Sequence, residues 1–205
     1  YVTRRFAWTV RHELGVDSLE LEVSLHEPTY QATRANNPGY LYDGELPRYA
    51  EYIVDGTTPD IERAASALFQ QSQERRYSTY EEISCALAFV QSITYSLDED
   101  STGKTEYWRF PIETLYDETG DCEDSTILAG ALLRRLGHSV VVLGLPKHVA
   151  LGVEVPAGTP GRFVEHEGKR MYFCETTSTG WSVGEVPGSL LEQELTIIPV
   201  PALNP

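Results

Sequence analysis

The period of the apolar residues changes at Gly137, and this change constrains the fold more than any other feature of the sequence. Up to that glycine, the run GDCEDSTILAGALLRRLG carries an apolar face at helical spacing, made of Ile127, Leu128, Ala131, Leu132 and Leu136. After it come alternating and continuous apolar runs of strand length. Helices followed by strands of this kind predict an α+β domain in which the helices pack on an antiparallel β-sheet.

Four segments after Gly137 are predicted strands: HSVVVLGL, KHVALGVEV, GRFVEH and KRMYFCETT. The first is a continuous apolar run, which is typical of a buried strand, and the second alternates. The last two flank Glu167-Gly168, a pair of residues suited to a hairpin turn.

The N-terminal segment from Arg4 to Leu25 alternates apolar and polar residues on both sides of a Gly-Val-Asp-Ser turn region, as a β-ribbon does. From Glu27 to Asp60, Pro, Gly and Asn predict a loop with short helical pieces. We therefore expect residues 1–57 to form a ribbon-and-loop extension and residues 58–205 to form the main domain.

Helix start signals open that main domain. Thr58-Pro59-Asp60 precedes IERAASALFQQSQER, a capping box from Ser78 to Glu81 precedes EEISCALAFVQSI, and IETLYD after Pro111 forms a short turn. Cys85 lies beside the apolar stripe of the second helix, which indicates a buried core residue. The run DEDSTGKT lacks calcium-loop spacing and is predicted to be a solvated loop.

The formal charge of −15 comes from 31 acidic and 16 basic residues, and only three of the basic residues are lysines. Such a surface repels nucleic acid and anionic lipid. The carboxylates are dispersed along the chain, which indicates a solvated surface of the kind that keeps a protein soluble in concentrated salt. We hypothesise a halophilic, acidic protein.

Three cysteines at wide spacing argue against a disulfide framework and against a CxxC zinc site. No apolar run reaches the length of a membrane span, so we expect no membrane insertion by this segment. The chain starts without Met, so a signal or anchor could have been removed and the localisation is not determined.

Cys122 is the candidate nucleophile. Asp121 occupies the N-cap position of the predicted helix, with Asp124 three residues on, so Cys122 lies among unpaired backbone N–H groups. These groups and the helix dipole favour a thiolate, lower its pKa and could bind an oxyanion. The neighbouring carboxylates, including Glu123, act in the opposite direction, so a cationic partner is needed.

His148 is the candidate partner, and Glu175 is the candidate residue that orients it. On its predicted strand, His148 shares a face with the small residues Ala150 and Gly152, which suggests room for a ligand, and a surface strand without a function is the alternative. Glu175 lies on the last predicted strand and shares a face with Met171 and Phe173, so its carboxylate needs a partner, and it could fix the imidazole tautomer. Cys174 points to the other face, outside the site.

Together these residues resemble a known family. The stretch PIETLYDETGDCEDSTILAGALLRRLGHSVVVLGLPKHVALGV, followed by YFCETTSTGWSVGEVP, resembles the transglutaminase-like superfamily, especially its archaeal and bacterial cysteine-peptidase-like branches. The resemblance implies a papain-like core with Cys122 as nucleophile, His148 as general base and acid, and Glu175 as orienting acid. Many members have Asp at the third position, and the longer Glu can serve the same role.

The resemblance also implies a second oxyanion donor upstream of the nucleophile. Tyr107, Trp108, Tyr95 and Gln91 all qualify, and we favour Tyr107. Packing of the aromatic residues in EYWRFP against the core is the alternative. Glu113, Trp181 and Glu185 also occupy motif positions, and we interpret them as scaffold.

Three functions are open to this sequence. The first is acyl transfer from a peptide, isopeptide or glutamine amide, with hydrolysis favoured over cross-linking and no cofactor required. The second is a protein- or peptide-binding module that keeps the fold without turnover. In the third, Cys122, His148 and Glu175 bind zinc, although the usual local ligand pairs are missing.

Overall fold

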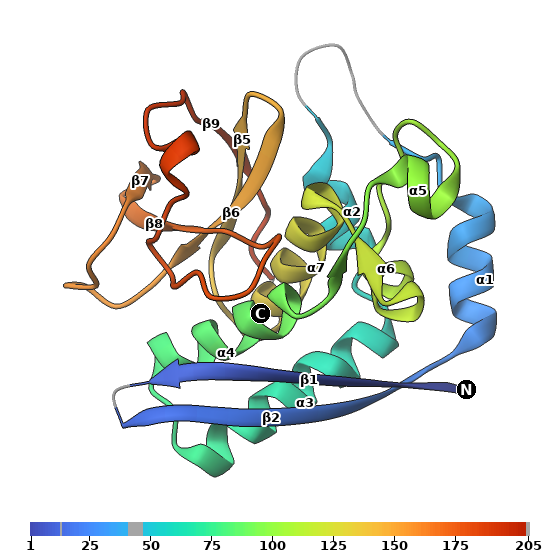
Figure 1. The fold of residues 1–205 in the computed structure, drawn as a ribbon, viewed down its shortest axis with the longest axis horizontal. Helices are drawn as coiled ribbons and strands as arrows, with labels where there is room; N and C mark the ends of the chain where they lie inside the picture. Colours follow the sequence, from blue (N-terminus) through green and yellow to red (C-terminus); the bar gives the residue numbers. More distant parts are fainter. Residues whose placement is uncertain (13, 41–46, 204–205) are drawn as a thin grey trace.

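The computed structural model describes residues 1–12, 14–40 and 47–203. A β-ribbon begins the chain, helices follow, and a sheet occupies the C-terminal third (Figure 1). In chain order the elements are β1 (Val2–His12), β2 (Gly15–Leu25), α1 (Glu27–Asn36), α2 (Tyr49–Asp55), α3 (Pro59–Arg75), α4 (Thr79–Gln91), β3 (Thr94–Tyr95), α5 (Asp98–Thr102), α6 (Pro111–Asp117), β4 (Thr119–Gly120), α7 (Cys122–Arg135), β5 (Val140–Leu145), β6 (His148–Glu154), β7 (Phe163–His166), β8 (Lys169–Cys174) and β9 (Thr196–Pro199). The α+β class predicted from the sequence is confirmed.

Five antiparallel strands form the sheet, in the order β7-β8-β6-β5-β9. The predicted turn between β7 and β8 is present, with Glu167 and Gly168 both at positive φ, the conformation that two-residue hairpins require. Strand β9, a four-residue edge strand within a Pro-rich tail, was not predicted from the sequence. Its short apolar run does not show the alternation of a longer strand.

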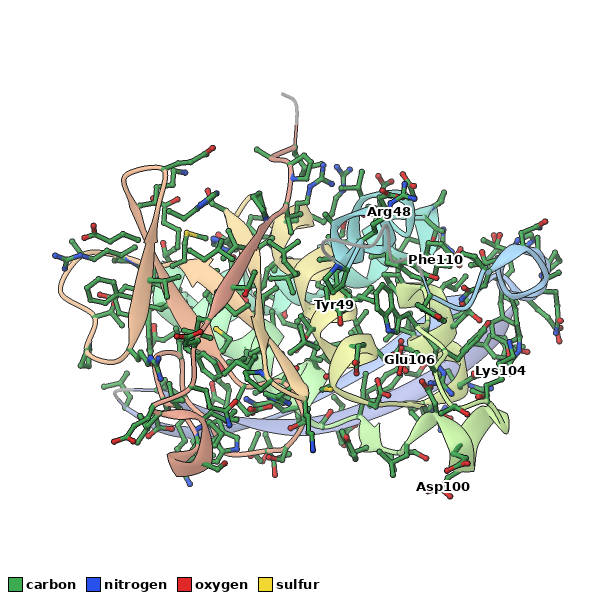
Figure 2. All side chains as sticks on the ribbon, turned by 90° about the horizontal axis from the view of Figure 1, so that it is seen from above. Arg48, Tyr49, Asp100, Lys104, Glu106 and Phe110 are labelled. Carbon is green, nitrogen blue, oxygen red and sulfur yellow. The ribbon has the colours of Figure 1, made fainter. Side chains whose placement is uncertain are left out.

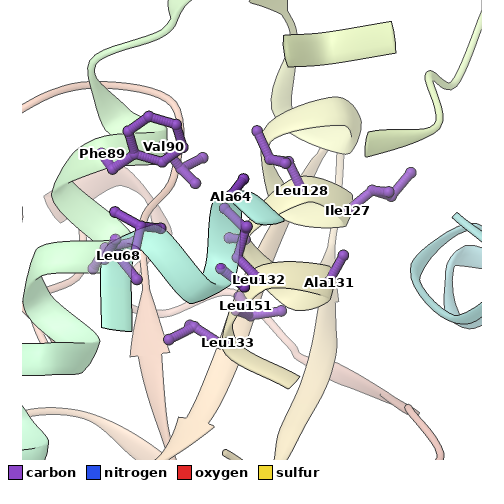
Figure 3. Packing of buried hydrophobic residues seen from close by; sticks show 14 of the residues in the cluster. Ala64, Leu68, Phe89, Val90, Ile127, Leu128, Ala131, Leu132, Leu133 and Leu151 are labelled. Carbon is purple, nitrogen blue, oxygen red and sulfur yellow. The ribbon is translucent and has the colours of Figure 1, made fainter. Parts of the chain in front are cut away.

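Helix α7 packs against one face of the sheet. Alternate residues of β6 (Val149, Leu151 and Val153) face it and share a core with α3 and α4. Figure 3 shows side chains of this cluster from the helices meeting Leu151 of the sheet. This burial contributes the dominant favourable term to folding and fixes the helix that carries Cys122 on the sheet.

The ribbon of β1 and β2 lies across α4 (Figure 1). Phe6 and Trp8 both contact the ring of Phe89 edge-on, with centroids 5.1 Å apart in each pair. The register pairs His12 with Gly15, so the Gly-Val-Asp-Ser segment begins β2 and does not form the turn that we expected. The boundary at residue 57 stays a prediction, and residues on both sides of it contribute to one apolar cluster.

The segment predicted as a loop with short helical pieces contains two helices, and the predicted DEDSTGKT loop contains a third. Helix α2 buries Tyr49, Tyr52 and Ile53, and α1 precedes it, whereas residues 41–46 of the predicted loop lie outside the described residues. In the predicted DEDSTGKT loop, Asp98 is buried and begins α5. Within the described parts of the chain, no helix combines the length and apolar character needed to cross a bilayer.

Candidate active site

Cys122 is the first residue of α7, as the sequence predicts. Asp121 is its N-cap, and its side chain accepts a hydrogen bond from the backbone N–H of Asp124 at 3.4 Å. The Asp124 carboxylate accepts in return from the backbone N–H of Asp121 at 3.3 Å. This capping box leaves the half-buried Cys122 directly inside the helix start.

Arg109, a residue that no sequence pattern indicated, holds this helix start in place. Its guanidinium is fully buried and donates to Asp124 Oδ2 at 2.5 Å and to Asp98 Oδ1 at 3.3 Å. Its backbone N–H also donates to Asp124 Oδ1 at 2.6 Å. A buried arginine with several carboxylate partners therefore connects α5, the segment before α6, and α7.

His148 and Glu175 lie together, as expected. The imidazole Nε2 is 2.9 Å from Glu175 Oε2, at the start of β6 and just past the end of β8. The other carboxylate oxygen accepts from the backbone N–H groups of Thr176 and Thr177 and from the Thr177 hydroxyl. Burial alone would raise the pKa of Glu175, but the hydrogen bonds from His148 and Thr177 outweigh it and lower this pKa.

A chain of hydroxyl groups connects the three elements of the site. Ser125 Oγ lies 2.8 Å from Thr176 Oγ1, which lies 3.2 Å from Thr126 Oγ1. Thr126 then donates to the carbonyl of Val149 at 3.3 Å. The first turns of α7 are thus bonded to the residue after Glu175 and to the residue after His148. Sequence spacing gave no sign of this link, because the hydroxyls meet only in the tertiary fold.

The thiol of Cys122 does not have the lowered pKa that its helix position suggests. Its Sγ donates to Glu123 Oε2 at 2.8 Å, and among the described residues no hydrogen bond joins it to His148. Burial raises the pKa of Cys122, and the Glu123 carboxylate raises it further, although the backbone N–H of Val149 faces the sulfur and opposes both. In this arrangement burial and the adjacent carboxylate outweigh the helix dipole.

Asp121 shares this acidic environment. Its pKa is raised by burial and then by the negative charges of Asp124, Glu123 and Asp98. A protonated Asp121 places one charge fewer beside the sulfur, which makes a thiolate at Cys122 easier to form.

Tyr107, the favoured oxyanion donor, is engaged elsewhere. Its hydroxyl is buried and donates to Glu113 Oε1 at 2.6 Å. Gln91 donates to the carbonyls of Glu175 and Trp181, and the Trp108 indole donates to Glu106. These three candidates therefore have structural partners, and for Tyr107 and Trp108 this agrees with the alternative of packing in the EYWRFP loop.

Tyr95 is the remaining candidate, and it lies beside the nucleophile's helix. It pairs with Gly120 in the short parallel ladder of β3 and β4, two residues before Cys122. Burial, and then the negative charges of Cys122 and Asp121, raise the pKa of its phenol to about 12. Its hydroxyl has no hydrogen-bond partner within the described residues and is available to a ligand.

Tyr49 and Glu106, both labelled in Figure 2, border the same region, since the Glu106 charge is among those that raise the pKa of Tyr49. Burial raises the pKa of Tyr49, and the charges of Glu123 and Cys122 add to this effect. The Tyr49 ring packs on Trp108 with centroids 4.2 Å apart. Aromatic and acidic side chains therefore surround the start of α7.

The small residues on the His148 face of β6 serve packing and do not provide room for a ligand. Ala150 is fully buried in a second apolar cluster with Leu143 and Phe173. A Cβ at Gly152 would meet Val141 at 2.7 Å. The interpretation of this face as space for a ligand is therefore wrong, because apolar side chains of the second cluster fill it.

The scaffold residues have clear partners. Glu113 accepts from the backbone N–H of Phe110 at the start of α6, and Glu185 accepts from the backbone N–H of Ser182. The Trp181 indole donates to Ser178. Cys85 and Cys174 are buried in the core.

No protein-family model matches this sequence, and no curated protein matches it. Within the part of the chain that the structure describes, no group of three or more histidine, cysteine or acidic side chains is arranged to hold a metal ion. Any functional assignment therefore depends on the site itself.

Proposed function

We propose that this protein is a cysteine-dependent acyl-transfer enzyme of the transglutaminase-like kind, with a papain-like core. Cys122 is the nucleophile, His148 the general base and acid, and Glu175 the orienting acid. The substrate is a peptide, isopeptide or glutamine amide, and we expect hydrolysis rather than cross-linking.

The contact between His148 and Glu175 carries this proposal. A buried carboxylate that accepts the Nε2 proton fixes the tautomer, so Nδ1 keeps a free lone pair that can take a proton. The backbone N–H of Val149, the residue after His148, faces the Cys122 sulfur, so the strand that carries His148 begins beside the helix start that carries the thiol, which supports the pairing. A rotation of the thiol from Glu123 toward Nδ1 would complete the chain of proton transfer.

The reaction follows from these roles. His148 takes the thiol proton, the thiolate of Cys122 attacks the amide carbonyl, and a C–S bond forms. The C–N bond then breaks as the leaving amine takes the proton from the imidazolium. Water then attacks the thioester and gives a proton to His148, the C–S bond breaks, and His148 returns that proton to the Cys122 sulfur as the carboxylic acid leaves.

Oxyanion stabilisation falls to groups at the start of α7. The backbone N–H of Cys122 belongs to the free N-terminal set of the helix, and the Tyr95 hydroxyl supplies a second donor from the β3–β4 ladder. We therefore assign the second donor to Tyr95 in place of Tyr107.

Alkylation by iodoacetamide, followed across pH by mass spectrometry, tests the pair of Cys122 and His148. We expect Cys122 to be labelled faster than Cys85 and Cys174, and this advantage to be lost in His148→Ala. Acyl transfer is then measured with p-nitrophenyl acetate, which should acetylate Cys122 and release nitrophenol in the wild type only. Equal labelling of all three cysteines and no acetylation would contradict the proposal.

A non-catalytic binding module is the second candidate, and one observation favours it. The thiol is hydrogen-bonded to Glu123, and its pKa is raised by burial and by this carboxylate. A protein that keeps this arrangement in solution would hold a neutral, unreactive thiol, and iodoacetamide labelling of Cys122 would then be as slow as that of Cys85.

A further inference from the structure

The two edges of the N-terminal ribbon differ. On β2, the carbonyl of Glu20 accepts from Gln71 at 2.7 Å, and the carbonyl of Ser24 accepts from Arg63 at 3.4 Å. Both donors belong to α3, so side chains of that helix cover the β2 edge. The β1 edge has no such cover: within the described residues, no hydrogen bond from outside the ribbon reaches the β1 backbone.

The register determines which β1 groups point outward. Glu20 and Ser24 have carbonyls that face away from β1, and they pair with Ala7 and Thr3. In an antiparallel ladder, when one residue of a directly opposed pair points its N–H and C=O groups away from the partner strand, the opposite residue does the same. Because the pattern repeats every second residue, the outward N–H and C=O groups on the other edge belong to Thr3, Arg5, Ala7, Thr9 and Arg11.

A trough of about 530 Å³ runs along this open edge. Residues 7–11 of β1 form one side, Tyr80 and Gln91 of α4 lie on another, and residues 179–182, including Trp181, close it. A second hollow continues it along residues 5–7 to Thr94 and Glu118. The trough therefore offers a row of backbone donors and acceptors, with aromatic surfaces beside them.

Two arginines lie along the trough edge of this strongly acidic protein, and one acidic residue, Glu118, lines the second hollow. The arginines are Arg5 and Arg11, and both are exposed. Arg5 pairs with Glu22 at the surface, whereas Arg11 forms no ion pair within the described ranges. The two arginines lie six residues apart on one face of the strand, a separation of roughly 20 Å.

We propose that the open edge of β1 binds an extended, acidic polypeptide segment as an added strand. The outward backbone groups hydrogen-bond to the segment's main chain, Tyr80 and Trp181 contact its side chains, and Arg5 and Arg11 select carboxylates six residues apart. This inference does not depend on chemistry at Cys122.

A second copy of the chain fits this edge less well. Antiparallel pairing of two β1 strands about Trp8 would set Arg5 of one copy opposite Arg11 of the other, and like charges opposite one another are unfavourable. Pairing with β2 of another copy would have to displace the α3 side chains from Glu20 and Ser24.

Fluorescence anisotropy with a defined probe tests the proposal. The probe is a fluorescein-labelled peptide of alternating threonine and valine with glutamates six residues apart, and its control carries lysines at those positions. We expect the glutamate peptide to bind at least tenfold more tightly. Of two peptides N-methylated at alternate amides, one should lose binding and the other should keep it.

Matched proline variants test the edge itself. Thr9→Pro removes an outward N–H of β1, and Ser18→Pro removes the corresponding N–H of its partner on β2, so neither takes a bond from the ladder. We expect Thr9→Pro to weaken probe binding at least tenfold and Ser18→Pro to leave it within twofold. Melting temperatures establish that both variants fold, and Arg5→Glu/Arg11→Glu replaces Thr9→Pro if that variant does not.

Three outcomes would overturn the proposal: equal binding of the glutamate and lysine peptides, no binding of either, or equal binding by both proline variants. Sedimentation of the free protein tests whether a second copy of the chain occupies this edge. A dimer that dissociates in Thr9→Pro would assign the edge to a second copy of the chain.

Discussion

The hydroxyl of Ser125 lies 2.8 Å from that of Thr176, which joins the first turn of the nucleophile's helix to the residue after Glu175. Thr126 extends this link to the carbonyl of Val149, beside His148. The relative positions of the three proposed catalytic residues therefore depend on hydroxyl groups that take no part in the reaction.

Removing one hydroxyl from this chain should weaken both stability and acyl transfer. Thr126→Val keeps the side-chain shape but leaves the Val149 carbonyl and the Thr176 hydroxyl without this partner. We expect the free energy of unfolding in urea to fall by about 1–2 kcal/mol. The rate of Cys122 acetylation should fall as well. Thr159→Val, whose hydroxyl bonds within an exposed loop, is the control and should change neither quantity.

Glu123→Gln should make the thiol of Cys122 more reactive. The Glu123 carboxylate accepts from the thiol and raises its pKa, so a neutral amide at this position removes that charge and lowers the pKa. Iodoacetamide labelling at pH 7 should become several-fold faster, and its pH profile should move to lower pH. Glu165→Gln, at the outer strand of the sheet, is the matched control. An unchanged profile in Glu123→Gln would mean that this carboxylate does not control the thiol.

Arg109 should contribute more to stability than any surface arginine. Arg109→Met leaves the buried carboxylates of Asp98 and Asp124 without their cation, a change that costs about 3–5 kcal/mol. The exposed pair of Arg135 and Glu62 gives the comparison, since Arg135→Met should cost less than about 1 kcal/mol. Urea unfolding of both variants measures the difference, and similar losses would contradict this role for Arg109.

Asp121 should make stability depend on pH. Its folded-state pKa is raised above the ordinary value of 3.8, so the folded protein keeps a proton that the unfolded chain releases. Stability is therefore lost as the pH rises from the unfolded pKa toward the folded one. Asp121→Asn keeps an N-cap residue without the titration, so its unfolding free energy should fall less over this range. Parallel curves for the wild type and the variant would show that Asp121 titrates normally.

The acidic surface should make the protein more stable in concentrated salt. With a formal charge of −15 and few lysines, repulsion between carboxylates weakens as salt screens it. The thermal unfolding midpoint should rise between low and multimolar potassium chloride. A thermal unfolding midpoint that stays constant or falls with salt would contradict the halophilic hypothesis.

Local signals predicted much of the fold. The capping boxes at Ser78 and Asp121 gave the starts of α4 and α7, and the hairpin at Glu167-Gly168 gave the pairing of β7 and β8. These features depend on residues close together in the chain. The position of α2 within the loop with short helical pieces was not predicted, because this helix is stabilised by contacts of Tyr49 and Tyr52 with Trp108, which lies far along the sequence.

The candidate site was predictable in its members but not in its electrostatics. Residue types and order indicated Cys122, His148 and Glu175, and the structure places the last two in contact. The hydrogen bond from the thiol to Glu123, the engagement of Tyr107 by Glu113 and the buried Arg109 depend on side-chain directions and on burial. Neither can be read from sequence spacing.

The pairing of β8 with β6 has a consequence for a chain that is still being synthesised. Glu175 reaches His148 only after β8 has joined the sheet, about fifty residues after Cys122 leaves the ribosome. Until then the imidazole has no carboxylate to orient it. With the proposed chemistry, incomplete chains and truncated products would have no catalytic activity. The nascent polypeptide and neighbouring proteins would then not be attacked by Cys122 before folding is complete.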